Sequence, residues 1–270
     1  MKRVRPKKHL GQHFLTDLDV ARRIADTVDA CPDIPVLEVG PGMGVLTQYL
    51  VAKERDLKVV EIDRESVAYL NEHFPRLREN IVGADFLRMD LGEVFGGRAF
   101  VLTGNYPYNI SSQIFFKMLD YRDIIPCCTG MLQKEVAERL CSGPGSKAYG
   151  ILSVLLQAWY DAEYLFSVPE TVFSPPPKVK SAVVRFTRNQ IRELGCDERL
   201  FKRLVKIVFN QRRKMMRGSI KPLLAQLDRE HESDVDHSGL LADPIMTQRP
   251  EQLSVAQFVA LTRRVSQEYA

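Results

Sequence analysis

The sequence predicts an α/β protein with a doubly wound, mostly parallel sheet over residues 1–187 and a small all-helical domain over residues 188–270. In the first part, short apolar runs alternate with amphipathic stretches, which is the signature of a parallel sheet covered by helices. A glycine-rich turn follows the first of these runs, and such turns bind nucleosides at the carboxyl ends of strands. Beyond Thr187 the apolar residues recur only at helical spacing, so we place the domain boundary there.

The first expected helix covers residues 17–30, because Val20, Ile24 and Val28 recur every four residues and Thr16 with Asp19 resembles a capping box. Five strands are expected at residues 35–39, 57–62, 80–84, 99–104 and 126–132. Helices are expected at residues 45–53, 65–73, 110–119, 134–140 and 149–160. Residues 163–168 and 181–187 are expected to form a closing antiparallel hairpin around a proline-rich loop.

The composition is that of a globular protein. Of the 270 residues, 45% are hydrophobic and 27% are charged, which excludes a disordered or fibrous class. The longest apolar runs are far shorter than the ~18 residues of a membrane span. The basic start lacks the apolar core of a secretory signal. The five cysteines form no CxxC pair, and the five histidines lack metal-ligand spacing. We therefore expect reduced cysteines, no metal site and a cytoplasmic protein.

The charge is unevenly distributed. The net charge is only +4, but the first eight residues carry five basic side chains and no acidic one. Residues 188–221 carry eleven basic side chains against three acidic ones. Two basic segments on an otherwise acidic chain indicate a polyanionic partner, most simply nucleic acid. The alternative is that these charges only solvate helix faces.

The glycine-rich turn, Gly40-Pro41-Gly42-Met43-Gly44, suggests a nucleoside cofactor. The third glycine of the dinucleotide fingerprint would fall on Val45, which disfavours NAD and favours S-adenosylmethionine, a cofactor without a pyrophosphate. Glu61 ends the next expected strand and is placed to bind ribose hydroxyls. Asp85 ends the third and is placed to accept a hydrogen bond from an adenine amine. The alternative for the glycines alone is a tight turn.

The tetrapeptide Asn105-Tyr106-Pro107-Tyr108 follows the fourth expected strand and is the candidate reaction centre. The exocyclic amine of adenine is a poor nucleophile because its lone pair is delocalised into the ring. Acceptors that bind the amine hydrogens favour the pyramidal nitrogen of the transition state. The Asn105 side chain and the Tyr106 carbonyl are the natural acceptors, and Tyr108 offers a stacking face. The alternative is a proline turn with packed tyrosines.

Two further segments are candidates for this site. Residues 11–15 precede the first helix, and His13 and Leu15 are placed to contact the cofactor, although a hydrophobic staple onto that helix is the alternative. Residues 173–181 form a stiff proline loop, and Phe173 is placed to form the second face of a sandwich around the base. The alternative for this loop is a simple connector.

Together these motifs resemble the bacterial KsgA (RsmA) and eukaryotic Dim-type ribosomal RNA adenine dimethyltransferases. The resemblance covers essentially the whole chain and lies in residues 8–15, 38–44, 105–111, 173–181, 209–214 and 249–254. It implies a class I S-adenosylmethionine-dependent methyltransferase fold, which is Rossmann-like with a seven-stranded, mostly parallel sheet, and a small helical domain that binds RNA. The sequence departs from the family at Tyr106, where leucine is commonest, and at His13, where asparagine is frequent.

The resemblance also implies an activity. Family members transfer two methyl groups from S-adenosylmethionine to N6 of each of two adjacent adenosines in the 3′-terminal hairpin of 16S rRNA, leaving S-adenosylhomocysteine. They also act in small-subunit biogenesis. We expect the immature small ribosomal subunit as partner, no membrane and a monomer. The implied cofactor contacts are His13, Leu15, Gly40, Glu61, Asp85 and Asn105. The implied base contacts are Asn105, Tyr108 and Phe173, and the implied RNA contacts are Arg212, Arg213 and Lys214 in a basic helix.

Three other functions stay open at this point. An Erm-like methyltransferase acting on large-subunit rRNA would share the glycine turn and the Asn105–Tyr108 block. A mainly non-catalytic ribosome-assembly factor would share the fold, although every catalytic motif is present here. A small-molecule methyltransferase would leave the basic segments and the helical domain unexplained.

Overall fold

The computed structural model describes residue 7 and residues 10–269 and divides into two compact units. Unit 1 comprises the chain up to Glu138 together with Asp161–Arg188, and unit 2 comprises Arg139–Tyr160 together with the chain from Asn189 onward. The chain passes from unit 1 to unit 2 for the last time between Arg188 and Asn189, one residue beyond the boundary expected at 187/188. Residues 139–160, expected in the first domain, instead pack with the C-terminal helices. Most of the basic N-terminal segment, residues 1–6 and 8–9, lies outside the described residues.

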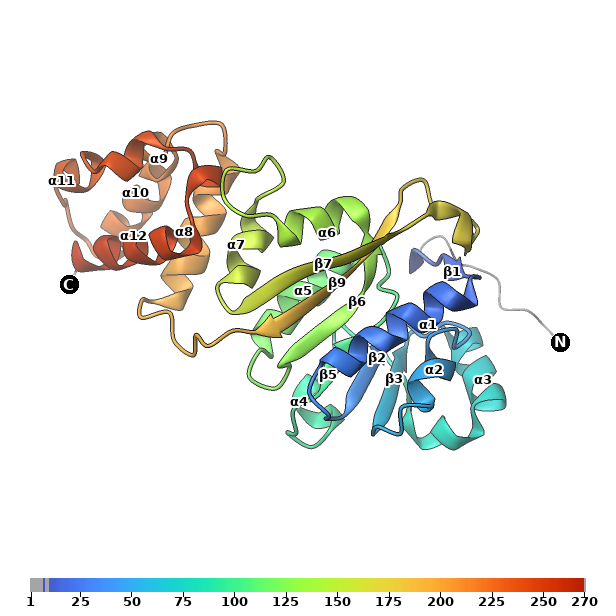
Figure 1. Ribbon diagram of the computed structural model, residues 1–270. Helices are drawn as coiled ribbons and strands as arrows, with labels where there is room; N and C mark the ends of the chain where they lie inside the picture. The colour runs from blue at the N-terminus through green and yellow to red at the C-terminus, as the bar shows by residue number, and fades with distance from the viewer. Residues whose placement is uncertain (1–6, 8–9, 270) are drawn as a thin grey trace. The chain divides into compact units, whose positions relative to one another are not determined.

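A seven-stranded sheet forms the centre of unit 1 (Figure 1). The strand order is β4 (Ile81–Gly83), β3 (Leu57–Glu61), β2 (Val36–Val39), β5 (Val101–Thr103), β6 (Cys127–Gln133), β9 (Ser181–Arg188) and β7 (Tyr160–Val168). The first five strands are mutually parallel and β9 is antiparallel to β6, so the predicted mostly parallel sheet is confirmed. Parallel pairing places the carboxyl ends of β2, β3, β4 and β5 at one edge of the sheet.

The helices of unit 1 connect these strands. They are α1 (Leu18–Asp26), α2 (Thr47–Val51), α3 (Arg64–His73), α4 (Leu91–Val94), α5 (Ser111–Asp120) and the first part of α6 (Lys134–Cys141), whose last residues belong to unit 2, with 3₁₀ turns η2 (Thr27–Ala30), η3 (Pro75–Asn80) and η4 (Glu170–Val172). Asp17, rather than Thr16, caps α1, because it has extended backbone geometry and its side chain accepts from Val20 N at 3.0 Å. The Thr16 hydroxyl instead donates to the Val172 carbonyl at 2.9 Å, which corrects the predicted capping box.

Two very short strands form a second, two-stranded antiparallel sheet. β1 (Phe14–Leu15) pairs with β8 (Phe173–Ser174), with Leu15 opposite Phe173. Each strand has two residues, which is too short for an alternating pattern to reveal. This pairing joins the segment before α1 to the proline-rich loop, two segments that the sequence linked only as parts of one site.

Two of the cysteines differ from expectation. Cys31 and Cys127 form a disulfide, whereas the sequence predicted five reduced thiols. The packing of η2 against β6 brings together these two residues, which are 96 positions apart, and no local spacing indicates the pair. Cys127 and Cys128 are both fully buried within β6.

Unit 2 is helical, and among the described residues no strand follows Arg188. Its helices are α7 (Ile151–Gln157), α8 (Glu198–Asn210), α9 (Met216–Ser219), α10 (Lys221–Glu230), α11 (Ser238–Leu241) and α12 (Val255–Gln267), with 3₁₀ turns η5 (Pro244–Thr247) and η6 (Pro250–Gln252). The ring of Trp159 packs edge-on against Phe201, and the ring of Tyr149 against Phe209, which explains why residues 139–160 belong to this unit. Within the described part of the chain, no helix is long and apolar enough to cross a membrane.

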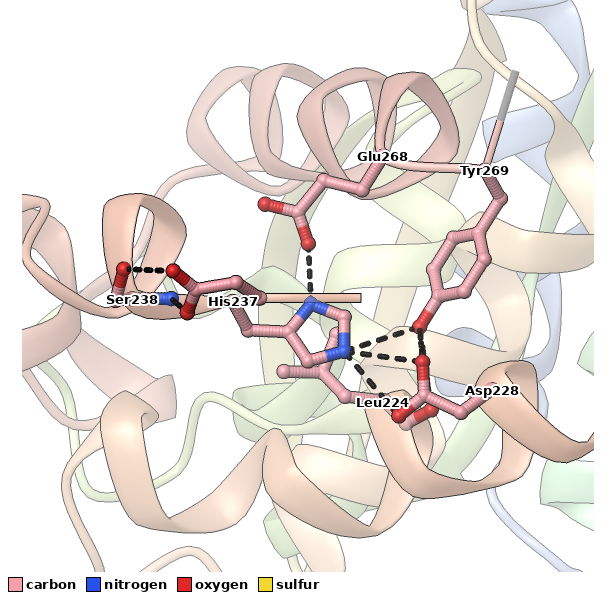
Figure 2. Close-up of polar contacts among 7 residues, drawn as sticks. Leu224, Asp228, His237, Ser238, Glu268 and Tyr269 are labelled. Atoms are coloured by element: carbon pink, nitrogen blue, oxygen red, sulfur yellow. Dashed lines mark hydrogen bonds and ion pairs between the residues drawn. The ribbon is translucent and has the colours of Figure 1, made fainter. Parts of the chain in front are cut away.

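A polar cluster in unit 2 ties together α10, α11 and the end of α12 (Figure 2). His237 contacts Glu268 Oε2 through Nδ1 at 2.5 Å and Asp228 Oδ1 through Nε2 at 3.2 Å. The Tyr269 hydroxyl donates to the same Asp228 carboxylate at 2.7 Å. Burial lowers the pKa of His237, but hydrogen bonds to the two carboxylates outweigh it, so its pKa lies above the usual 6.5.

Replacing His237 with glutamine is expected to destabilise unit 2 in a pH-dependent way. A raised pKa means that the stabilisation is fully present below the unfolded-state pKa and is lost as the pH rises through the folded-state pKa. The variant should therefore lose about 2 kcal/mol at mildly acidic pH and progressively less at alkaline pH. Urea unfolding followed by Trp159 fluorescence measures this difference. A loss that is equal at all pH values would contradict a charged His237.

Candidate functional site

A cavity of about 200 Å³ lies at the carboxyl edge of the sheet in unit 1. Its walls are residues 10–15, the glycine turn, the ends of β3 and β4, and the segment after β5. It brings together seven of the eight residues predicted for the cofactor and the base, namely His13, Leu15, Gly40, Glu61, Asp85, Asn105 and Tyr108. The eighth, Phe173, does not line it. The cavity is therefore where the sequence placed the reaction.

The glycine turn forms the floor of the cavity next to the tetrapeptide. Gly40 has φ +68° and Gly42 has φ +56°, a conformation that disfavours side chains. A Cβ on Gly40 would lie 3.6 Å from Pro107 Cγ, and one on Gly42 would lie 3.1 Å from Phe14 Cε1. The bare backbone thus leaves room for a ligand between the turn, the tetrapeptide and residues 10–15.

Glu61 is held rigidly at the end of β3. Its Oε2 accepts from Gly42 N at 3.0 Å and its Oε1 accepts from Asp63 N at 2.8 Å. Burial raises the pKa of Glu61, although these backbone hydrogen bonds oppose the shift. Each carboxylate oxygen keeps a second lone pair. The carboxylate is therefore preset to accept hydrogen bonds from two neighbouring hydroxyls.

The next part of the wall combines a carboxylate with an apolar platform. Asp85 accepts from Leu87 N at 2.9 Å through Oδ1 and lines the cavity. Ile62 lines the same cavity and is 53% exposed, which is unusual for a large apolar side chain. This combination suits a flat heterocycle with an exocyclic amine. Sequence reasoning missed Ile62, and the available signal was its place directly after the acidic strand end.

Glu38 is a second residue that sequence reasoning missed. It is 1% exposed within β2, and the Thr47 hydroxyl donates to its Oε2 at 2.7 Å. Burial, reinforced by the nearby Glu61 carboxylate, raises the pKa of Glu38 to about 8. Glu38 is therefore mostly protonated at neutral pH. The sequence feature that could have identified Glu38 is the presence of an acidic residue inside an apolar run just before the glycine turn.

The orientation of Asn105 is set by the segment that faces it. Asn105 extends β5 through a bridge to Met131, and its Nδ2 donates to the His13 carbonyl at 3.3 Å. The amide oxygen, Oδ1, is thereby left as an acceptor for a ligand. The Tyr106 side chain is fully buried, and its hydroxyl donates to the Thr129 carbonyl at 2.8 Å. Only the backbone of Tyr106 is therefore available to a ligand, as its sequence position indicated.

Tyr108 is fixed at both its hydroxyl and its ring. Its hydroxyl is hydrogen-bonded to the Ser181 hydroxyl, and its ring stacks on His13 with centroids 5.5 Å apart. His13 Nδ1 donates to the Pro175 carbonyl at 2.9 Å. Phe173, by contrast, is 4% exposed and packs in the core beside Leu15, because β8 pairs there with β1. The structure therefore does not bring the Phe173 ring to the cavity, contrary to the prediction.

The predicted RNA-contact residues lie in unit 2, but not in a helix. α8 ends at Asn210 and residues 211–214 form a turn, because Lys214 N bonds back to the Gln211 carbonyl at 2.8 Å. Arg212 is partly engaged, with Nη2 donating to the Ser146 carbonyl at 3.3 Å and Nε 3.7 Å from Glu251. Arg213 and Lys214 are exposed. The expected basic helix is thus corrected to a basic turn.

Comparisons with known sequences identify the family. The sequence model described as "Ribosomal RNA adenine dimethylase" matches residues 3–259. The ribosomal RNA small subunit methyltransferase A of Phocaeicola vulgatus is 65% identical over 262 residues, covering 97% of this chain and 90% of that protein. The protein of the same name from Porphyromonas gingivalis is 56% identical over 269 residues, covering 99% of this chain and all of that protein.

Solved structures agree with this fold. The crystal structure of a dimethyladenosine transferase from Plasmodium falciparum matches with a TM-score of 0.79 at 23% identity, covering 95% of this chain and 98% of that one. The crystal structure of the 23S rRNA methyltransferase ErmE matches with a TM-score of 0.65 at 26% identity, covering 92% of this chain and 99% of that one. The expected class I methyltransferase architecture is thereby confirmed. The chain belongs to the ribosomal RNA adenine dimethylase family of methyltransferases.

Proposed function

We propose that the chain uses S-adenosylmethionine to dimethylate N6 of two adjacent adenosines in the 3′-terminal hairpin of 16S rRNA. The observation that carries the proposal is that the Glu61 and Asp85 carboxylates and the Asn105 amide all line one cavity. Relatives up to 65% identical are named as small-subunit methyltransferases, whereas ErmE is 26% identical. This difference favours the small-subunit substrate over the large-subunit one. The substrate implies a cytoplasmic protein that works on the immature small subunit, and we expect it to be a monomer.

The cavity fits this cofactor. The glycine turn, which a Cβ at Gly40 or Gly42 would strain, would admit the methionine part of the cofactor, and Glu61, held by Gly42 N, would accept from the two ribose hydroxyls. Asp85 and Ile62 line the same cavity, where Asp85 would accept from the adenine amine and Ile62 would pack against the ring. His13 and Leu15 also line the cavity. When bound, S-adenosylmethionine supplies an electrophilic methyl group.

The chain's own contribution to the reaction is to activate and orient the target amine. Asn105 Oδ1 and the Tyr106 carbonyl accept the two amine hydrogens, which localises the nitrogen lone pair for attack. Tyr108, held by Ser181, supports the base by stacking. The methylated nitrogen is acidic and releases its proton to water, so no general base is needed. Phe173 contributes indirectly, because its pairing with Leu15 in the β1–β8 sheet holds Leu15 in the cavity wall. Direct stacking of Phe173 on the target base would require its ring to become exposed when RNA binds.

The basic turn is proposed to contact RNA phosphates. Replacing Arg213 and Lys214 together with alanine should weaken binding to the small-subunit hairpin and reduce the slope of log affinity against log salt by roughly one to two. Cofactor affinity should not change. We leave Arg212 intact because its contact with Ser146 makes it partly structural. Filter binding over a salt series measures the slope, with Arg22→Ala/Arg76→Ala as a matched loss of two exposed charges. An unchanged slope would remove RNA contact from this turn.

Methyl transfer to defined subunits tests the proposed function. Small ribosomal subunits that lack the dimethylation are incubated with tritiated S-adenosylmethionine beside fully methylated subunits and large-subunit rRNA. We expect incorporation approaching the four methyl groups implied by two dimethyladenosines, and almost none into the methylated subunits. Incorporation into large-subunit rRNA alone would establish the Erm-like activity instead. Subunit binding without incorporation would establish an assembly factor.

A further inference from the structure

Lys7 connects the N-terminal segment to the start of α3. Its Nζ forms ion pairs with Asp63 and, at 3.2 Å, with Glu65 Oε1. Asp63 is nearly inaccessible, with 2% of its side chain exposed, whereas Lys7 is 29% exposed. Ion pairs that are partly shielded from water are stronger than fully exposed ones. The pair therefore forms a defined attachment and not a transient surface contact.

The attachment holds residues 10–15, which we call the strap, and every strap residue lines the cavity. The Lys7 carbonyl accepts from Leu10 N at 3.0 Å, and Lys7 N donates to Gln12 Oε1 at 2.9 Å. Gly11 has φ +64°, and a Cβ there would lie 2.6 Å from Asn109 Oδ1, so the strap presses closely on the segment after the tetrapeptide. Lys7 fixes one end of the strap, and the β1–β8 pairing fixes the other.

The same ion pair reaches the predicted ribose ligand. Asp63 N donates to Glu61 Oε1 at 2.8 Å, and the Asp63 carboxylate accepts from Glu65 N at 3.3 Å and from the Ser66 hydroxyl at 3.1 Å. Burial alone would raise the pKa of Asp63. The hydrogen bonds to its carboxylate, foremost the one from Lys7, outweigh burial and hold the pKa below its usual value, so Asp63 is ionised. Lys7 thus also offsets negative charge beside Glu61, whose own pKa is raised by burial and by Asp63.

We propose that Lys7 is a positioning residue for S-adenosylmethionine: by pairing with Asp63 and Glu65 it holds the strap against the cavity and keeps Glu61 oriented. This inference rests on the proposed cofactor and deepens it. It assigns Lys7 to cofactor retention, although Lys7 belongs to a basic segment whose sequence indicates contact with RNA. The bound cofactor should then leave the cavity faster when the ion pair is removed.

The test measures cofactor binding in the absence of RNA. For Lys7→Met, which keeps an unbranched side chain of nearly the same length and removes its charge, we expect S-adenosylmethionine to bind about tenfold more weakly, mainly through faster dissociation. Lys7→Arg should restore affinity to within about twofold, because it retains both ion pairs. Glu65→Gln, which removes only one of the two partners, should give an intermediate loss. Titration calorimetry gives the affinity and stopped-flow displacement gives the dissociation rate.

Salt dependence and a matched control separate this role from a general one. High salt should weaken cofactor binding to the wild-type protein and have less effect on Lys7→Met, because Lys7 and Glu65 are 29% and 60% exposed and their ion pair is therefore open to screening. Lys53→Met is the matched control: Lys53 pairs with Asp26 and Asp29 at 3.0 and 2.6 Å, and none of the three lines the cavity. Its cofactor affinity should equal that of the wild type.

Two results would overturn the inference. One is a Lys7→Met protein that binds and releases the cofactor like the wild type, even if its affinity for RNA falls. The other is an equal loss of cofactor affinity in Lys53→Met, which would indicate a general effect of destabilisation. If the wild-type protein itself binds no S-adenosylmethionine, the proposed function fails, and this outcome is distinct from both.

Discussion

Replacing Asn105 with alanine is expected to lower the rate of methyl transfer by about 10²–10³-fold, the loss typical of removing one preorganised group that stabilises a transition state. The reason is that Asn105 Oδ1 accepts a hydrogen bond more strongly as the target nitrogen becomes pyramidal and partly positive. Its orientation is already set by the bond from Nδ2 to the His13 carbonyl. Alanine removes the acceptor, and no neighbouring group replaces it in the proposed arrangement.

Single-turnover methyl transfer with saturating cofactor and undermethylated small subunits measures this effect. Cofactor affinity, measured separately, should fall less than about tenfold, since Asn105 contributes only one of several cofactor contacts. Asn71→Ala is the matched control, because it removes an asparagine whose Nδ2 donates to the Val67 carbonyl at 2.9 Å in α3, outside the cavity. A drop in cofactor affinity that accounts for the whole loss of rate would contradict the assignment to the target amine.

The fold was predictable because its determinants are local. Each parallel strand is an apolar run of a few residues, and a segment whose apolar residues recur at helical spacing lies next to it. The strands β2, β3, β4, β5 and β6 all lie within or overlap their predicted ranges. The chain order of strands and helices then implies the sheet. The β1–β8 sheet and the Cys31–Cys127 disulfide were not predictable, since each joins distant segments that carry no pattern of their own. The grouping of residues 139–160 with unit 2 likewise depends on packing between distant aromatic rings.

The site was predictable where function requires a residue type at a strand end. Gly40, Glu61, Asp85 and Asn105 lie at or just after the carboxyl ends of four parallel strands, so the topology alone gathers them. Phe173 was predicted to stack on the target base, but its ring does not line the cavity, because a two-residue strand pairing turns it into the core. Whether a given side chain on such a loop faces the cavity depends on tertiary contacts, and a single sequence does not contain them.

The buried Glu38 leads to a prediction in the opposite direction: replacing it with glutamine should stabilise the protein. Its pKa is about 8 in the folded chain against 4.5 as the ordinary value, because burial penalises the carboxylate. Between these two values the folded state holds a proton that the unfolded state has released, so the stability of the wild-type protein falls as the pH rises. Glutamine has the shape of the protonated acid, retains an acceptor for Thr47 and has no proton to release.

The expected gain in the free energy of unfolding is about 1 kcal/mol near pH 5 and about 3 kcal/mol near pH 7. Urea unfolding of the wild type and Glu38→Gln across this range, followed by far-ultraviolet circular dichroism, measures the gain and its slope. Asp90→Asn is a suitable control, since Asp90 is an exposed carboxylate that caps α4 and asparagine serves equally well as a cap, so the stability of this variant should change little with pH. If Glu38→Gln is instead less stable by the same amount at every pH, then Glu38 is ionised in the fold and the proposed raised pKa is wrong.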